Sequence, residues 1–219
     1  MSDDADTPIL ELRQYAMKRG RRDELIEIFE RDLAAPLEER GSIVHGQFRD
    51  LDDPDRFVWL RGFTSMRSRR DALTSFYTSD LWYRHRDAVN DTLVDSDNVL
   101  LLRPARPGSG LASPAPRPAA ADDGGMIVAA IHRNEDDASP DRGEVAAVGG
   151  TLLGSYVTEQ EPNNYPPLPI REGEDLAVWL VAFADRERGA RYAEAQTRRG
   201  GAVQVLRLAP TSRSALRAS

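Results

Sequence analysis

The sequence predicts an α+β protein built from two tandem ferredoxin-like (βαββαβ) units that face each other as one intramolecular barrel. Three observations support this fold class. A segment rich in proline, glycine and alanine, residues 106–125, divides the 219-residue chain into two halves. Short blocks of sequence recur in the same order in both halves. The first half alternates strand-like and helix-like patterns in the order β-α-β-β-α-β.

The composition is that of an ordinary globular chain, and it excludes several classes of protein. Hydrophobic residues make up 40% of the chain and charged residues 30%. The longest apolar run, Leu176 to Ala184, is far shorter than the roughly 20 residues of a membrane span. The net charge of −7 argues against nucleic-acid binding. The absence of cysteine excludes disulfides and thiolate metal sites. We therefore expect a cytoplasmic protein with no nucleic-acid or membrane partner.

The repeated blocks suggest where the domains begin and end. Each half contains a Gly-x-aromatic block, then a Val-Trp-Leu block, then a leucine-rich segment that stops at proline. These blocks are 46–48, 58–63 and 100–104 in the first half, and 154–156, 178–183 and 206–210 in the second. We predict a first domain over 7–105, a linker over 106–125 and a degenerate second domain over 126–211.

The elements of the first half follow from the spacing of its apolar residues. Alternation of apolar and polar residues predicts strands, and apolar residues three or four apart predict helices. The predicted strands are 9–15, 43–49, 57–63 and 99–103, and the predicted helices are 23–39, 65–77 and 80–93. These helices would all cover one face of the sheet. The other face is apolar too, so another element must pack against it.

A second unit of the same plan supplies that cover within the chain. Two four-stranded sheets make an eight-stranded barrel, which is just wide enough to fill itself or to hold one small ligand. The barrel should therefore form in a monomer, and further oligomerisation through other surfaces is left open.

The second half is shorter and carries a longer loop. From Trp59 to Pro104 is 45 positions and from Trp179 to Pro210 is 31, so a segment as long as one helix is missing. Residues 158–173 form a proline-rich loop of a length that is usually functional or disordered. We expect it to fold over one end of the barrel as a partial lid, with Tyr165 pointing inward. The rival interpretation is a mobile surface loop that does not contact the cavity.

Strand alternation also predicts which side chains share a face. Leu10, Leu12, Val58 and Leu60 are expected to pack on the helices. The opposite set, with Arg13, Tyr15, Trp59 and Arg61, would then line the barrel interior. His45, Gln47 and, in the second half, His132 are placed in the same cavity. Because buried charges must be paired or must meet a ligand, such an interior is not a dry core.

The first half resembles the NIPSNAP family of dimeric α+β-barrel proteins. The motifs that carry the resemblance are Glu11-Leu12-Arg13-x-Tyr15, Gly20, Gly46-x-Phe48, Trp59-Leu60 with Phe63, Phe76-Tyr77-x-Ser79-Asp80-x-Trp82 and Leu101-Leu102-x-Pro104. The resemblance implies a ferredoxin-like unit that builds a two-sheet barrel. Relatives that share this barrel include haem enzymes, cofactor-free oxygenases and isomerases, so the resemblance implies little about the reaction.

The candidate site combines proton-transfer groups with polar and aromatic lining residues. We predict that the protein binds a small, partly apolar organic molecule in the barrel cavity. If it is catalytic, the chemistry would be acid–base without a cofactor, with His45 or Tyr15 moving a proton. The predicted substrate-binding residues are Arg13, Gln47, Trp59, Arg61, Trp82, His85, His132 and Tyr165.

Two alternatives remain open. No H-x-H or H-E-x-x-H spacing is present, so no metal site is predicted, although one histidine could ligate haem. The Met66–Arg70 run on a predicted helix is interpreted as a solvated face. The alternative function is a non-catalytic structural or interaction protein with a closed, ion-paired barrel interior. A connected cavity of about 300 Å³ lined by these polar groups would favour the small-molecule site.

Overall fold

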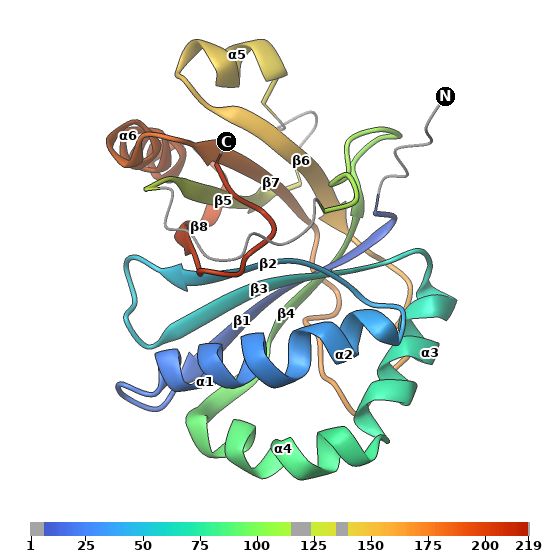
Figure 1. The fold of residues 1–219 in the computed structure, drawn as a ribbon. Helices are drawn as coiled ribbons and strands as arrows, with labels where there is room; N and C mark the ends of the chain where they lie inside the picture. Colours follow the sequence, from blue (N-terminus) through green and yellow to red (C-terminus); the bar gives the residue numbers. More distant parts are fainter. Residues whose placement is uncertain (1–6, 115–123, 135–139, 219) are drawn as a thin grey trace.

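The structure is a computed structural model that describes residues 7–114, 124–134 and 140–218 (Figure 1). In the first half, β1 (Ile9–Met17) is followed by α1 (Arg22–Ile28), the π-helical turn η1 (Phe29–Leu33) and α2 (Ala34–Glu39). The half continues with β2 (Ile43–Asp50), β3 (Arg56–Phe63), α3 (Met66–Tyr77), α4 (Asp80–Thr92) and β4 (Leu93–Pro104). The second half contains β5 (Met126–Arg133), α5 (Arg142–Ala147), β6 (Thr151–Thr158), β7 (Leu176–Phe183), α6 (Arg186–Arg198) and β8 (Ala202–Pro210).

All eight strands close into one antiparallel barrel with the order β1-β3-β2-β8-β5-β7-β6-β4. Within it, the first half has the order β4-β1-β3-β2 and the second half the order β8-β5-β7-β6, which is the same arrangement. The halves join through short ladders between β2 and β8 and between β4 and β6. The predicted fold class, two tandem ferredoxin-like units that form a barrel within one chain, is therefore confirmed. Much of the predicted linker, residues 115–123, lies outside the described residues.

The strand register places Trp59 and Trp179 at equivalent positions in the two halves. Trp59 on β3 lies opposite Arg13 on β1, and Trp179 on β7 lies opposite Ala130 on β5. Two residues along each ladder, Glu11 lies opposite Arg61 in the first half and Val128 opposite Val181 in the second. Both tryptophans are buried. The duplication inferred from short sequence blocks thus extends to the pairing of individual residues.

The barrel interior is filled by apolar side chains, which reverses the predicted assignment of faces. One buried cluster, here called the barrel core, draws residues from all eight strands and none from a helix. It includes Leu10, Leu12, Val58, Leu60, Leu100, Leu102, Ile127, Ala129, Ile131, Tyr156, Val178, Leu180, Leu206 and Leu208. An eight-stranded barrel is just wide enough for such side chains to fill it, and here they do so. No barrel cavity lined by Arg13, Tyr15, Trp59 and Arg61 therefore exists in the described structure.

The opposite faces of the strands pack against the helices. Tyr15, Phe57 and Trp59 share a cluster with the α1–η1–α2 segment, and Trp179 shares one with α6. Figure 1 shows α1 and α2 lying across β1, β2 and β3. The π-helical turn precedes Pro36, which cannot donate an i→i−4 hydrogen bond in the helix interior. The second half has only α6 between β7 and β8, so the predicted loss of one helix is confirmed.

Segments outside the strands cover one end of the barrel. Leu111, Leu216 and Ala218 pack against the barrel core, and the Leu216 N–H donates to the His45 carbonyl at 2.8 Å. The His45 ring is buried there, with Nε2 2.9 Å from Thr7 Oγ1. Burial lowers the pKa of His45 to about 4. Among the described residues, no helix is both long and apolar enough to cross a bilayer.

We expect Trp59→Ala and Trp179→Ala each to lower the free energy of unfolding by about 3–5 kcal/mol, because each removes a fully packed indole between sheet and helix. Urea unfolding followed by circular dichroism measures this change. A loss below about 1 kcal/mol for either variant would show that the two tryptophans are not equivalent core anchors.

We expect His45 to make the protein less stable as the pH falls. The unfolded chain binds a proton near pH 6.5 and the folded chain only near pH 4, so the stability is lost between these values. From pH 7 to pH 5 the native protein should lose about 2 kcal/mol more than His45→Gln. Urea midpoints across this range test the difference. Equal losses of stability in the native protein and in His45→Gln would show that His45 does not cause this pH dependence.

Candidate functional site

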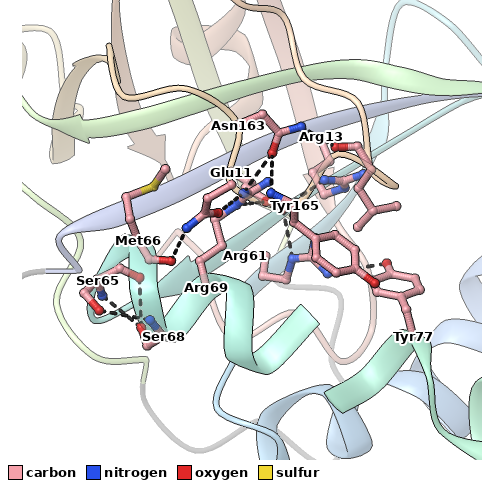
Figure 2. A network of polar contacts seen from close by, with 12 residues as sticks. Glu11, Arg13, Arg61, Ser65, Met66, Ser68, Arg69, Tyr77, Asn163 and Tyr165 are labelled. Carbon is pink, nitrogen blue, oxygen red and sulfur yellow. Dashed lines mark hydrogen bonds and ion pairs between the residues drawn. The ribbon is translucent and has the colours of Figure 1, made fainter. Parts of the chain in front are cut away.

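A single buried carboxylate binds three buried arginines in the layer between the first sheet and α3. Glu11 Oε2 accepts from Arg13 Nη1 at 2.9 Å and from Arg61 Nε and Nη2 at 2.9 and 2.6 Å. Its other oxygen, Oε1, accepts from Arg69 Nε at 2.7 Å. All four side chains are at most 1% exposed. Figure 2 shows this group, here called the arginine cluster, converging on Glu11 from β1, β3 and α3.

The arginine cluster carries more positive than negative charge. Three guanidinium groups and one carboxylate leave a formal charge of +2 in a desolvated place. Burial would raise the pKa of Glu11, but the charges of Arg61, Arg13 and Arg69 hold it far below its usual range. Burial lowers the pKa of Arg69, and Glu11 offsets this only in part. The cluster is therefore short of an anion.

Neutral oxygens accept several of the remaining guanidinium hydrogens. Arg13 Nε donates to the Tyr15 hydroxyl at 3.0 Å, and Arg61 Nη1 lies 3.5 Å from the Tyr77 hydroxyl. Arg69 Nη1 donates to the side-chain oxygens of Asn163 and Asn164 at 3.1 and 2.7 Å. Arg69 Nη2 is buried and has no hydrogen-bond partner among the described residues. These neutral oxygens accept hydrogen bonds from the guanidinium groups but do not neutralise their positive charge.

The second half shows that the fold does not require these charges. The register makes Val128, Ala130 and Val181 the counterparts of Glu11, Arg13 and Arg61. The second sheet packs on α6 through these small apolar residues. Replacing a buried ion cluster by apolar residues is often neutral or stabilising. Retention of the cluster in the first half therefore points to a role other than holding the sheet to its helices.

Aromatic rings surround the arginine cluster. The guanidinium carbons of Arg13 and Arg61 lie 5.6 and 4.9 Å from the centre of the Trp59 ring. On the other side, the Tyr77 ring contacts Trp82 at 5.0 Å and Tyr165 at 6.2 Å between centroids. Cations over indole and phenol faces are stabilised by the ring quadrupole. These rings would also offer flat apolar walls to an organic ligand.

The loop 159–175 of the second half covers this site. Its ends are tied to β4, because the N–H groups of Glu159 and Arg171 donate to the carbonyls of Leu101 and Val99. Asn164 Nδ2 donates to the Met66 carbonyl at the start of α3. Tyr165 is half-buried and packs beside α3. The prediction of a loop over one end of the barrel is wrong, since the loop lies on the helix side. A role for Tyr165 in ligand binding stays a prediction.

The structure brings some of the predicted site residues together and separates others. Arg13, Tyr15, Trp59, Arg61, Trp82 and Tyr165 all belong to the arginine cluster or its aromatic surround. Gln47 lies directly opposite Trp59 on the helix-facing side, not in the barrel as predicted. The pairing of β2 with β3 is irregular between Val44 and Gly46, which places Val44 on the helix side and Phe48 in the barrel core. Gln47 thus shares the face of Trp59, as alternation predicts, whereas the irregularity falls at His45 and separates it from that face.

The three histidines lie in three separate places. His45 is at the covered end of the barrel, as described above. His85 on α4 lies 3.6 Å from Asp32, near the surface. His132 stacks on Trp179 in the second half, so the prediction that it shares a cavity with Tyr15 is wrong. Of the two predicted proton-transfer residues, Tyr15 therefore lies at the arginine cluster and His45 does not.

Sequence reasoning overlooked Arg69, because the Met66–Arg70 run was interpreted as a solvated face. Arg69 is instead fully buried. The missed signal was helical spacing: Met66, Arg69, Leu73 and Phe76 recur at intervals of three and four and share one buried face of α3. The hydrogen bonds from Arg69 to Asn163 and Asn164 had no comparable signal in the sequence, because they depend on the conformation of a long loop.

The arginine cluster is closed in this conformation. Its four charged side chains are at most 1% exposed, and four grooves over the described residues, of about 560, 330, 260 and 40 Å³, are lined by other residues. Groups of three or more potential metal ligands are likewise not found in the described part of the chain. A ligand could reach the cluster only if the covering loop moved.

No family model matches the sequence, and no curated protein matches it significantly. Solved structures do share its fold. A candidate monooxygenase from Lactobacillus acidophilus NCFM is 14% identical, with 96% of this chain and 99% of that chain aligned and a TM-score of 0.54. Another candidate monooxygenase, from Fusobacterium nucleatum, is 9% identical, with 96% and 97% aligned and a TM-score of 0.52.

Matches over about half of the chain include NIPSNAP family proteins. A NIPSNAP domain protein from Burkholderia xenovorans is 14% identical, with 44% of this chain and 94% of that chain aligned and a TM-score of 0.41. The family whose motifs the first half resembles is thus present among the structural matches. Identities this low show the fold alone. The chain has the fold of the α+β barrel proteins that match it along nearly its whole length.

Proposed function

We propose that the first half binds a small organic anion at the arginine cluster, beneath the loop 159–175. One observation carries the proposal: three fully buried arginines share a single carboxylate, whereas the equivalent strand positions of the second half are apolar. A carboxylate or enolate oxygen would supply the missing negative charge. Arginine is suited to this task because its planar donors match a carboxylate.

For an anion to bind at Arg69, the loop 159–175 must move away from this residue. The side-chain oxygens of Asn163 and Asn164 occupy Arg69 Nη1 in the closed state, and a ligand anion would replace these neutral acceptors. The unpartnered Nη2 of the same guanidinium would then also find an acceptor. Tyr77, Tyr165 and Trp82 would line the body of the ligand. The loop thus acts as a lid over the helix side of the sheet.

If the site is catalytic, Tyr15 is the residue to move a proton. Its hydroxyl accepts from Arg13 Nε, so its own hydrogen is left to be donated. Burial raises the pKa of Tyr15, with Arg13 opposing, which favours the protonated form at neutral pH. A cationic surround that stabilises an enolate would suit acid–base chemistry without a cofactor. His45 has no place in this scheme, because it lies at the covered end of the barrel.

A structural role is the second candidate, and the closure of the cluster favours it. In that case Arg69, Asn163 and Asn164 would serve only to fasten the loop of the second half onto the first. Such a clamp needs no ligand, and removing Arg69 would then weaken the fold without changing any binding property.

We expect the native protein to be stabilised by small carboxylates, sulfonates or phosphates and not by their neutral amides or esters. A ligand present at 100 times its Kd should raise the free energy of unfolding by about 2.7 kcal/mol. Thermal-shift screening followed by calorimetry measures the affinity. Arg69→Met should weaken binding at least about tenfold, since it removes a charged donor. It should still fold, because two arginines continue to pair with Glu11.

Arg70→Met is the matched control, since Arg70 is the exposed neighbour of Arg69 on the same helix. This variant should bind as the native protein does. If no anion binds the native protein, or if Arg69→Met binds equally well, the anion site does not exist. A loss of melting temperature in Arg69→Met, with no anion bound by the native protein, would identify the structural clamp.

A further inference from the structure

Two buried polar side chains next to the arginine cluster lack hydrogen-bond partners. Gln47 is fully buried, and within the described residues neither its Nε2 nor its Oε1 has a partner. The Nε1 atom of Trp59 is likewise buried and unpartnered. The main chain of Gln47 is bonded normally, since its N–H donates to Ser214 Oγ and its carbonyl accepts from Thr211 N–H. Only the side-chain amide is left without partners.

These groups adjoin the anion site. Gln47 on β2 lies opposite Trp59 on β3, and Trp59 lies opposite Arg13 on β1. The three side chains form a row on the helix-facing side, and neighbouring strands are about 4.8 Å apart. The two ends of the row are therefore roughly 10 Å apart at the backbone. The guanidinium groups of Arg13 and Arg61 lie over the Trp59 ring. The ring therefore lies between Gln47 at one end of the row and Arg13 at the other.

An unpartnered amide in this position is costly, and the fold does not require it. Burying an amide without hydrogen bonds costs about 1–3 kcal/mol on the scale of protein mutations. The strand register makes Ser155, opposite Trp179, the counterpart of Gln47 in the second half. The half that contains the arginine cluster thus has the longer glutamine side chain at the position where the other half has serine. Within the described residues, both its donor and its acceptor are left without a partner.

We infer that the ligand carries a second oxygen function besides its anionic group, and that Gln47 and Trp59 recognise it. This inference rests on the proposed anion site. A keto oxygen could accept from Gln47 Nε2 and Trp59 Nε1 together, and a hydroxyl could also donate to Gln47 Oε1. The wall beside them is apolar, with Phe29 4.8 Å from the Trp59 ring. The ligand class is therefore an oxo- or hydroxy-acid with a short apolar spacer.

Calorimetry with matched acids tests the inference on the full-length protein. The probes are 4-oxopentanoate, 5-oxohexanoate and 6-oxoheptanoate, each compared with pentanoate, hexanoate or heptanoate of the same chain length. At least one oxo acid should bind about three- to tenfold more tightly than its partner, which corresponds to one or two hydrogen bonds. Gln47→Leu should reduce this preference, because only the Trp59 donor would remain, and should leave the affinity for the unsubstituted acid within about twofold.

Gln196→Leu is the control, because Gln196 is a buried glutamine of the second half whose Oε1 is also unpartnered. It should keep the preference for the oxo acid. Equal affinities within every pair for the native protein, or an undiminished preference in Gln47→Leu, would overturn the inference and leave the anion site standing. If no acid of either series binds and no other anion does, the proposed function itself fails and the inference with it.

Discussion

The Glu11 carboxylate is the contact on which the first half depends. It joins β1 to β3 through Arg61, the sheet to α3 through Arg69, and the second half to the first through the asparagines that Arg69 holds. Removing one partner of a buried ion pair leaves an uncompensated charge and is strongly destabilising, although the intact pair adds little net stability. The cluster therefore constrains the structure more than it stabilises it.

The architecture could be predicted because it follows from local patterns in the sequence. The strands of the first half alternate, its helices show a spacing of three and four, and the Trp59 and Trp179 blocks recur in order. The loss of a helix followed from a simple difference in length between the halves. The π-helical turn and the covering of the barrel end by residues 211–218 could not be predicted, because both depend on contacts between segments distant in sequence.

The choice of face could not be predicted, and the reason is physical. Alternation separates Leu10 and Leu12 from Glu11 and Arg13, but both sets are buried, one inside the barrel and one under the helices. Hydrophobicity therefore does not distinguish inside from outside here. The barrel interior holds mostly aliphatic side chains together with Phe48 and Tyr156, whereas Trp59, Trp179 and the clustered arginines lie in the layer beneath the helices and the loop. On that side, the loop residues Asn163 and Asn164 also supply acceptors for a guanidinium group.

Duplication within one chain allows the two halves to carry different tasks. The second half keeps the tryptophan but has valine and alanine where the first has its charges, so its sheet contributes core packing. It also carries the loop 159–175, whose Asn163 and Asn164 accept hydrogen bonds from Arg69 Nη1. A symmetric pair of identical units would repeat both the charges and the loop. Here the charges lie in one half and their cover in the other, so opening the site amounts to separating two parts of one molecule whose barrel stays closed.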